Sequence, residues 1–170
     1  MAVLTTGDEV VLPTATPGPG QLRDSHTDFL LAAGTALRLD FESLGIATDR
    51  ADNLGPLLRA GLERDVLLVC GGVSMGEFDL VEGTLIRLGC EVLFHGVNLQ
   101  PGKPLLVARH GGGWVFGLPG NPASVMVTYW LFVRPLLRRL MGLPDAFWAG
   151  ALRATLDAPL PAGAARDRFL

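Results

Sequence analysis

The sequence has no large excess of charge of either sign, which limits the partners it can have. Its 14 basic and 17 acidic residues give a formal net charge of −3 at pH 7. Proteins that bind nucleic acids usually present a strongly basic face to the phosphate backbone. We therefore expect no nucleic-acid partner. Lysine is scarcer still, because Lys103 is the only one, so an anionic ligand would need local positive groups.

Cysteine is also scarce, and its two positions do not suggest a metal site. Cys70 and Cys90 form no CxxC pair, and no cluster of histidine and cysteine has the spacing of zinc ligands. Each cysteine lies in an apolar run, VLLVC or CEVLF. Such surroundings are typical of buried, unreactive thiols.

The sequence also lacks long hydrophobic runs. The longest, residues 125–133, is too short to span a bilayer as a helix. The first residues do not show the positive, apolar and cleavage regions of a secretory signal peptide. We therefore expect no membrane partner and a cytoplasmic location.

What the sequence does contain is a regular alternation of strand-like and helix-like segments. Hydrophobic residues make up 49% of the 170 positions, enough for one domain with a substantial core. The alternation predicts an α/β fold with three layers, α/β/α, and a mostly parallel sheet. Strands are expected at residues 2–4, 45–47, 66–70, 91–94, 105–108 and 114–116. Helices are expected at residues 25–37, 53–62, 79–88 and 121–141.

Capping residues mark the ends of the predicted helices. Ser25 is expected to cap the first helix, with Asp28 completing a rough capping box. Asn121 followed by Pro122 favours the start of the last helix, and Pro135 should kink that helix. Residues 1–142 then form the predicted domain. Alanine, proline and leucine dominate residues 143–170, which we interpret as the start of a further, incomplete element.

Four loops rich in glycine and acidic residues follow predicted strands. Their sequences are TTGDE, ATD, GGVSMGEFD and GLPGNPAS. In open α/β sheets, ligands bind beyond the carboxyl ends of the strands. We therefore expect the four loops to open on one edge of the sheet and to form a binding site there.

The loop GGVSMGEFD, residues 71–79, joins a buried strand to a helix. Its glycines allow the backbone to approach a ligand, and its amides, with the hydroxyl of Ser74, could hold an anion. The spacing matches neither a dinucleotide-binding GxGxxG motif nor a Walker A loop. The alternative is a tight turn, for which one glycine suffices.

Two further motifs could contact the same ligand. In GLPGNPAS, residues 117–124, the first turn of the helix leaves amides free for an anion, although a well-capped helix alone explains the pattern. In PGKP, residues 101–104, two prolines restrict the turn that carries Lys103, so we expect its ammonium group to be held in place. A lysine exposed to solvent remains the alternative.

Acidic residues at strand ends suggest a metal site. Glu9, Asp49 and Asp79 come from separate loops, and such carboxylates can hold one Mg²⁺ ion together with water and a phosphate. Each could equally cap a helix or face solvent. Of the three histidines, only His95, close to the PGKP turn, could face the site, while His26 should lie near a helix start and His110 in a turn.

Together, TTGDE, GGVSMGEFD, PGKP and GLPGNPAS, in this order and spacing, resemble the molybdopterin molybdenumtransferase family over residues 1–142. This family includes bacterial enzymes and the corresponding domain of gephyrin. The resemblance implies a molybdopterin-binding domain with a MogA- or MoaB-like fold. It also implies insertion of molybdate into adenylylated molybdopterin, with release of AMP and with Mg²⁺ as cofactor. The full-length protein is expected to be a homodimer.

The resemblance also assigns roles to residues. Glu9, Asp49 and Asp79 match the acidic metal-binding positions, and Asp49, Asp79 and Lys103 are the expected catalytic residues. The expected substrate-binding residues are Thr6, Gly7, Gly71, Gly72, Ser74, Pro101, Gly102, Pro104, Pro119, Gly120, Asn121 and Ser124.

The chain departs from the family at two positions that are commonly basic, residue 100 and a position a few residues earlier, where the sequence is HGVN at residues 95–98. Gln100 stands where the family commonly has a lysine, and Arg50 or Arg109 could supply the missing charge. Two other functions remain open, a molybdopterin adenylyltransferase and a non-catalytic relative that binds a ligand or a protein. The family also has two domains before this one and a small β domain after it, so we expect a fragment or a shortened homologue.

Overall fold

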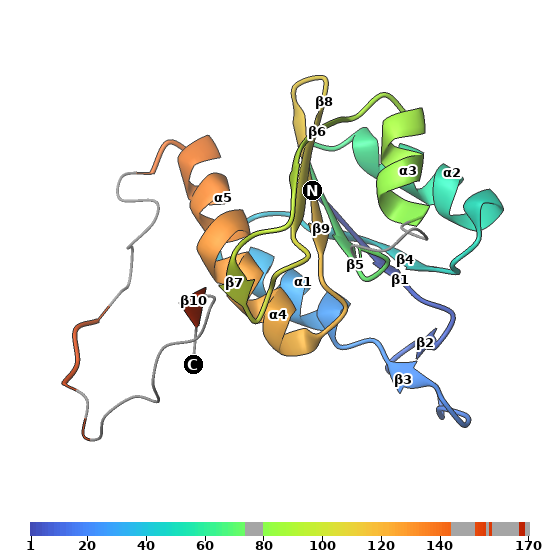
Figure 1. The fold of residues 1–170 in the computed structure, drawn as a ribbon, viewed down its shortest axis with the longest axis horizontal. Coiled ribbons are helices and arrows are strands. Elements are labelled where there is room, and N and C mark those ends of the chain that lie inside the picture. The colour runs from blue at the N-terminus through green and yellow to red at the C-terminus, as the bar shows by residue number, and fades with distance from the viewer. Residues whose placement is uncertain (74–79, 144–151, 156, 158–166, 169–170) are drawn as a thin grey trace.

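A six-stranded sheet forms the centre of the protein. The structure is a computed structural model and describes residues 1–73, 80–143, 152–155, 157 and 167–168. The strands of the sheet lie in the order β4-β1-β5-β9-β8-β6 (Figure 1). Their bounds are β1 Ala2–Thr6, β4 Glu42–Ala47, β5 Val66–Cys70, β6 Glu91–His95, β8 Leu106–His110 and β9 Gly113–Leu118.

The sheet is mostly parallel, as the alternation of elements predicts. β1 pairs in parallel with β4 and β5, and β5 pairs in parallel with β9. Only the last two strands, β8 and β6, run antiparallel to their neighbours. β8 and β9 form a hairpin that turns at Gly111 and Gly112.

Helices cover both faces of the sheet and confirm the three-layer architecture. α2 (Ala51–Leu62) and α3 (Leu80–Arg87) pack on one face (Figure 1). The other face carries α1 (His26–Ala36) and a long helical segment made of α4 (Pro122–Thr128), the π-helical turn η1 (Tyr129–Val133) and α5 (Arg134–Leu140). A separate hydrophobic cluster fills each of the two interfaces.

The sequence of the central strand β5 does not alternate between polar and apolar residues, because both faces of the strand are covered. All five of its residues are buried. Leu67 and Val69 belong to one cluster, and Leu68 and Cys70 to the other, because successive side chains point to opposite faces. Both cysteines are free and buried, and burial raises the pKa of each thiol. The interpretation of Cys70 and Cys90 as core thiols is therefore confirmed.

The helix ends match the predictions in part. Asn121 caps α4, because its side chain accepts a hydrogen bond from the backbone N–H of Ser124 at 3.2 Å. Ser25, however, makes no side-chain cap, because its backbone is already helical. The carboxylate of Asp24 caps α1 instead, accepting hydrogen bonds from the backbone N–H groups of His26 and Thr27.

Pro135 perturbs the last helix as expected, and the perturbation is a π-helical turn. Proline has no N–H group and cannot complete a regular helical turn. The backbone N–H of Arg134 donates to the carbonyl of Tyr129, five residues earlier. η1 therefore widens the helix immediately before Pro135, a common way of accommodating an irregular residue.

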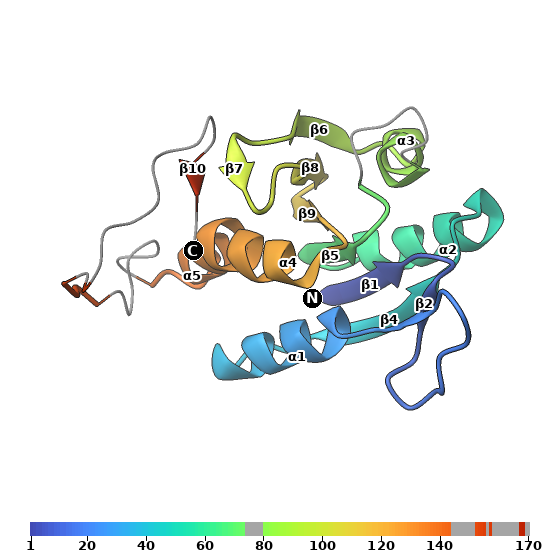
Figure 2. The same ribbon diagram turned by 60° about the horizontal axis from the view of Figure 1, so that its bottom comes forward.

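Short strands outside the main sheet fix two loops. β2 (Val10–Val11) pairs with β3 (Leu22–Arg23) and closes the loop at residues 12–21. β7 (Leu99–Gln100) precedes the PGKP turn and pairs with β10 (Asp167–Arg168), which lies beside it in Figure 2. No helix among the described residues is long and apolar enough to cross a membrane.

Candidate functional site

A cavity of about 230 Å³ opens at the carboxyl edge of the parallel strands. Segments that follow β1, β3, β4, β5 and β9 line it, together with one residue of the PGKP turn. The lining residues are Thr6, Gly7, Glu9, Val10, Leu22, Arg23, Asp24, Ser25, His26, Asp49, Gly71, Gly72, Val73, Pro104, Pro119, Gly120 and Pro122.

The register of the sheet explains why these segments meet. Thr6 lies opposite Ala47, so β1 and β4 end at the same level. Cys70 lies opposite Thr5 on one side and Leu118 on the other, so β5 and β9 end there too. The prediction that the loops after these strands open on one edge is therefore confirmed for their described residues. Residues 74–79, which include Ser74 and Asp79, lie outside the described part of the chain.

The two glycines after β5 allow this loop to cross closely over the end of β1. Gly71 and Gly72 have φ values of +90° and +64°, which residues with a side chain rarely adopt. A methyl group on Gly71 would lie 2.5 Å from the carbonyl oxygen of Thr6, and one on Gly72 would lie 2.7 Å from Thr6 Oγ1. Packing alone therefore requires both glycines, whatever ligand the loop binds.

One side of the cavity is acidic. Glu9 and Asp49 both line it, and the backbone N–H of Asp49 donates to Asp8 Oδ1 at 3.0 Å. Partial burial raises the pKa of Asp49, and the negative charges of Asp8 and Glu9 raise it further, against the lowering effect of a hydrogen bond with the Asp8 backbone. Three carboxylates in this position would be stabilised by a cation.

Two of these carboxylates, Glu9 and Asp49, are candidate ligands for a metal ion. Within residues 1–73 and 80–143, no group of three or more histidine, cysteine, aspartate or glutamate residues is arranged to hold a metal ion. Glu9 and Asp49 supply hard oxygen atoms of the kind that Mg²⁺ prefers. Water and ligand oxygens commonly complete the shell of a Mg²⁺ ion, so the oxygen donors present fit this metal.

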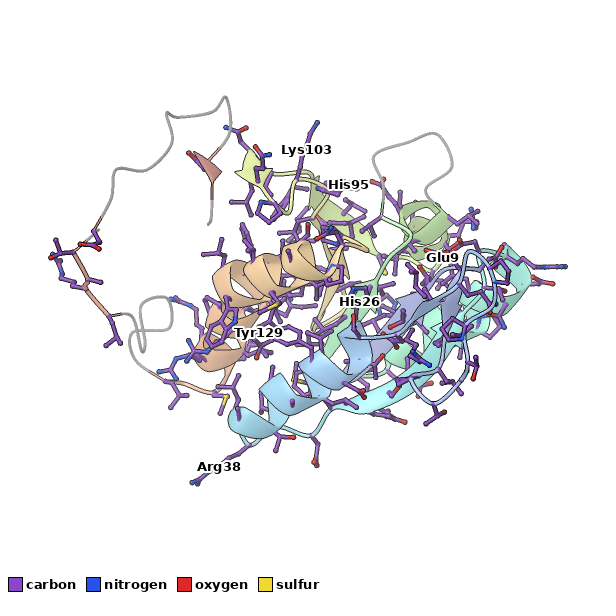
Figure 3. The ribbon with its side chains drawn as sticks, turned by 90° about the horizontal axis from the view of Figure 1, so that it is seen from below. Glu9, His26, Arg38, His95, Lys103 and Tyr129 are labelled. Carbon is purple, nitrogen blue, oxygen red and sulfur yellow. The ribbon has the colours of Figure 1, made fainter. Side chains whose placement is uncertain are left out.

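The start of α1 forms another side of the cavity, which the sequence analysis did not predict. Asp24 is 5% exposed, and its second carboxylate oxygen accepts a hydrogen bond from Thr27 Oγ1 at 2.6 Å. His26 is the first residue of α1, as expected, but it also borders the cavity (Figure 3). In the sequence, the polar run DSHT at residues 24–27, where a helix begins, is the feature that could have indicated this part of the site.

The PGKP turn contributes less than the sequence suggests. Lys103 is exposed and does not line the cavity, and Figure 3 shows its side chain pointing outward. The ammonium group is therefore not held as expected. Pro104 lines the cavity, whereas Pro101 and Gly102 do not. Gly102 lies close to Thr128 of α4, where an added methyl group would come within 2.8 Å of Thr128 Cγ2.

Several other expected residues lie beside the cavity or far from it. Asn121 caps α4 by accepting a hydrogen bond from the backbone N–H of Ser124, and neither residue lines the cavity. His95 does not line it either, and its Nδ1 lies 2.7 Å from Glu82 Oε2. Gln100 is exposed on β7, outside the lining set, so a lysine is not missing from this cavity at that position.

Neither proposed source of compensating charge lies in the cavity. Arg109 is at the opposite edge of the sheet, where its guanidinium stacks 4.4 Å from the ring centre of Trp114. Arg50 forms an exposed ion pair with Asp52 at 3.3 Å. The arginine that does line the cavity is Arg23, whose Nε donates to the carbonyl of Ala15. The lining therefore has three carboxylates and one guanidinium, so an anionic ligand would need an accompanying cation.

The sequence matches a known family over nearly all of the described α/β domain. Residues 2–139 match the family described as "Probable molybdopterin binding domain". The chain belongs to this family. The match includes every segment that lines the cavity.

Individual relatives give the same result. The chain is 38% identical over 147 residues to a molybdopterin molybdenumtransferase from Nostoc, covering 84% of this chain and 34% of that protein. A solved molybdopterin biosynthesis MoeA protein from Pyrococcus horikoshii is 36% identical, with a TM-score of 0.75, covering 83% of this chain and 35% of that one. The chain thus spans roughly a third to two fifths of the length of its curated relatives.

A more distant structure confirms the fold expected for residues 1–142. The molybdopterin biosynthesis enzyme MoaB from Thermus thermophilus is 16% identical and superimposes with a TM-score of 0.57. That match covers 84% of this chain and 96% of MoaB. The architecture is therefore shared with a MoaB-type domain along almost its whole length.

Proposed function

We propose that this chain is the substrate-binding domain of a molybdopterin molybdenumtransferase, which inserts molybdate into adenylylated molybdopterin and releases AMP. The observation that carries the proposal is the cavity at the carboxyl edge. It brings together the TTGDE, GGV and LPG segments in a chain that belongs to the molybdopterin-binding family. A relative with this transferase name is 38% identical, which supports the choice of reaction.

The size of the cavity is consistent with partial enclosure of such a substrate. Pockets for drug-sized ligands typically measure roughly 300–1,000 Å³. The described residues enclose about 230 Å³. We therefore expect the cavity to hold one portion of the pterin nucleotide, while the rest extends along the loops at the edge of the sheet.

Glu9 and Asp49 would hold the Mg²⁺ ion, with Asp79 as the third proposed ligand. When bound, this ion supplies positive charge that stabilises the phosphate oxygens as the anhydride bond breaks. Gly71 and Gly72 let the backbone approach the ligand at the same edge. Thr6, Gly7, Pro104, Pro119 and Gly120 complete the proposed contact surface.

Several residues to which the family resemblance assigns roles are not among the residues that line the cavity. Lys103 would have to turn inward to act as a catalytic residue, because its side chain is exposed in the free structure. Pro101, Gly102, Asn121 and Ser124 would contact substrate only outside the described cavity, and Ser74 stays a proposed contact among residues 74–79. For the full-length protein we propose a cytoplasmic homodimer, which light scattering after size-exclusion chromatography would test.

The direct test is the release of AMP from adenylylated molybdopterin by the purified protein. We expect release that requires both molybdate and Mg²⁺. Consumption of ATP without molybdate would instead identify an adenylyltransferase. Ligand binding without AMP release at any molybdate concentration would identify a non-catalytic relative. Gln100→Lys should change the rate little, because residue 100 does not line the cavity.

A further inference from the structure

The wall of the cavity contains three buried polar atoms that make no hydrogen bond. In the described part of the chain, five buried side-chain nitrogen or oxygen atoms lack a partner. Three belong to residues that line this cavity, namely Oγ1 of Thr6 and both ring nitrogens of His26. The other two are single nitrogens of Arg109 and Arg138, whose guanidinium groups carry further N–H donors. Unmet hydrogen-bonding capacity is therefore concentrated at one place.

The neighbouring polar groups show that local packing can satisfy such atoms. Thr5 is fully buried, and its hydroxyl lies 3.1 Å from Thr27 Oγ1. Asp24 accepts three hydrogen bonds from the first turn of α1. Thr6 is 3% exposed and His26 follows Asp24 by two residues, yet neither side chain has a partner. Buried unpaired groups are unfavourable, so these atoms call for a partner from outside the chain, which can be a ligand or a water.

The chemistry of the two side chains limits the class of ligand. Burial lowers the pKa of His26, opposed by the charge of Asp24, so the ring is neutral near pH 7. A neutral imidazole offers one donor and one acceptor, and a threonine hydroxyl offers both. The carboxylates of Glu9, Asp24 and Asp49 disfavour an anion beside this ring. A neutral group with adjacent donors and acceptors is the better complement.

We infer that His26 and Thr6 recognise the donor–acceptor edge of a neutral planar heterocycle, the chemical class that includes pterins. This inference rests on the proposed function, since it divides the same cavity into a heterocycle side and a metal–phosphate side. Val10, Leu22 and Pro122 supply apolar surface for the faces of the ring. Ligand binding must rotate the His26 ring and shift the Gly71–Gly72 segment away from Thr6, because all three unpaired atoms are shielded from solvent.

The test compares two ligands and four variants of the complete chain. Free pterin is followed by its fluorescence, and Mg²⁺-pyrophosphate by calorimetry. His26→Phe and Thr6→Val remove the unpaired atoms with little change of shape. Each should weaken pterin binding about 10- to 100-fold and leave pyrophosphate binding within about twofold. The Tm of the free protein should stay the same or rise.

Two controls separate recognition from folding. Thr5→Val removes a hydroxyl that is already bonded to Thr27, so it should lower the Tm and change pterin affinity less than about threefold. His26→Asn keeps one donor and one acceptor, and should recover part of the pterin affinity that His26→Phe loses.

The possible failures are distinguishable. The inference would be overturned if both His26→Phe and Thr6→Val kept their pterin affinity, or if they lost pyrophosphate binding and kept pterin binding. AMP release by the wild type would still support the transferase in that case. A wild-type protein that binds no pterin overturns it as well. Weakened pterin binding in a protein that releases no AMP would support the inference and reject the transferase.

Discussion

The two edges of the sheet differ in the partners that their polar and charged groups have. At the amino edge, Arg64 pairs with Glu42 at 2.8 Å, and Arg109 stacks on Trp114. At the carboxyl edge, Asp49 lies among negative neighbours, and Thr6 and His26 have no hydrogen-bond partner for their buried polar atoms. Apart from Arg109 Nε, the groups named at the first edge have the pairing expected of groups that serve stability, whereas the second edge holds groups that a ligand could stabilise.

The hollows at the two edges differ in the same way. A second cavity, of about 350 Å³, lies at the amino edge and is larger than the first. Its lining is dominated by large apolar side chains such as Met1, Leu39, Leu137 and Leu140, with Asp65 as the one charged residue. Size therefore does not single out the cavity at the carboxyl edge, and the chemistry of the lining is the better guide to the candidate site.

The largest effect should come from Gly71→Ala at the carboxyl edge. The substitution places a methyl group against the Thr6 carbonyl at a positive φ, so we expect a loss of about 2–4 kcal/mol in the free energy of unfolding. Gly120→Ala is the matched control, because its methyl group would meet nothing closer than 3.7 Å. Urea denaturation should show a loss under about 1 kcal/mol for this control. Equal losses would contradict the close crossing of the two loops.

Asp49→Asn should separate activity from stability. We expect metal-dependent AMP release to fall about 10- to 100-fold, because the metal loses a charged ligand. Asp52→Asn is the control, since Asp52 lies nearby on the surface and pairs with Arg50 outside the cavity. Its rate should remain within about twofold of the wild type. Equal losses of rate in both variants would argue for a general charge effect and against a metal ligand.

Asp24→Ala should destabilise the wall of the cavity that α1 forms. Three hydrogen-bond donors, from the backbone of His26 and from Thr27, lose their acceptor, so we expect a loss of about 2 kcal/mol. Asp28→Ala, in the same helical turn, should stay within about 0.5 kcal/mol because Asp28 is exposed. Thermal unfolding of both variants measures the difference. A larger loss of stability for Asp28→Ala than for Asp24→Ala would instead support the capping box predicted from Ser25 and Asp28.

Arg109→Ala should affect stability alone. Loss of the contact with Trp114 should cost about 0.5–1 kcal/mol, because the pair is only partly buried. AMP release should be unchanged, since the residue lies at the amino edge. A fall in activity together with unchanged stability would contradict the placement of the active site at the carboxyl edge alone.

The smallest effect concerns pH. The pKa of Asp49 is raised in the folded protein, so its ionised form opposes folding above that pKa, and protonation relieves this opposition as the pH falls. Asp49→Asn should therefore be more stable than the wild type near pH 7, by about a few tenths of a kcal/mol, because the side chain is exposed to solvent. The difference should vanish in acid. Urea titrations at several pH values would show whether it does.

Much of the architecture could be predicted because long buried elements leave strong patterns. The run VLLVC predicts a strand covered on both faces, and its register then aligns the ends of β1 and β9. The meeting of the loops at one edge follows from that parallel arrangement. Asn121 was found as a cap because its role depends on residues within four positions of it.

The parts that could not be predicted depend on contacts between distant segments. His26 reaches the cavity because β2 and β3 bring residues 22–26 back toward β1, and the backbone N–H of Leu22 donates to the Glu9 carbonyl at 2.7 Å. Strands of two residues have no detectable periodicity. Arg109 was misplaced because β8 runs antiparallel, which carries its end to the opposite edge. The outward direction of Lys103 could not be predicted either, because two flanking prolines restrict the backbone of the turn and leave the direction of the lysine side chain open.

Hydrogen exchange of the backbone amides, measured with and without adenylylated molybdopterin and Mg²⁺, tests the central claim most directly. The account predicts slower exchange in the ligand-bound protein for residues 7–9, 71–73 and 120, which surround the carboxyl-edge cavity. Residues 112–114 and 137–141, around the amino-edge cavity, should exchange at unchanged rates. Protection at the amino edge with none at the carboxyl edge would contradict the assignment of the site.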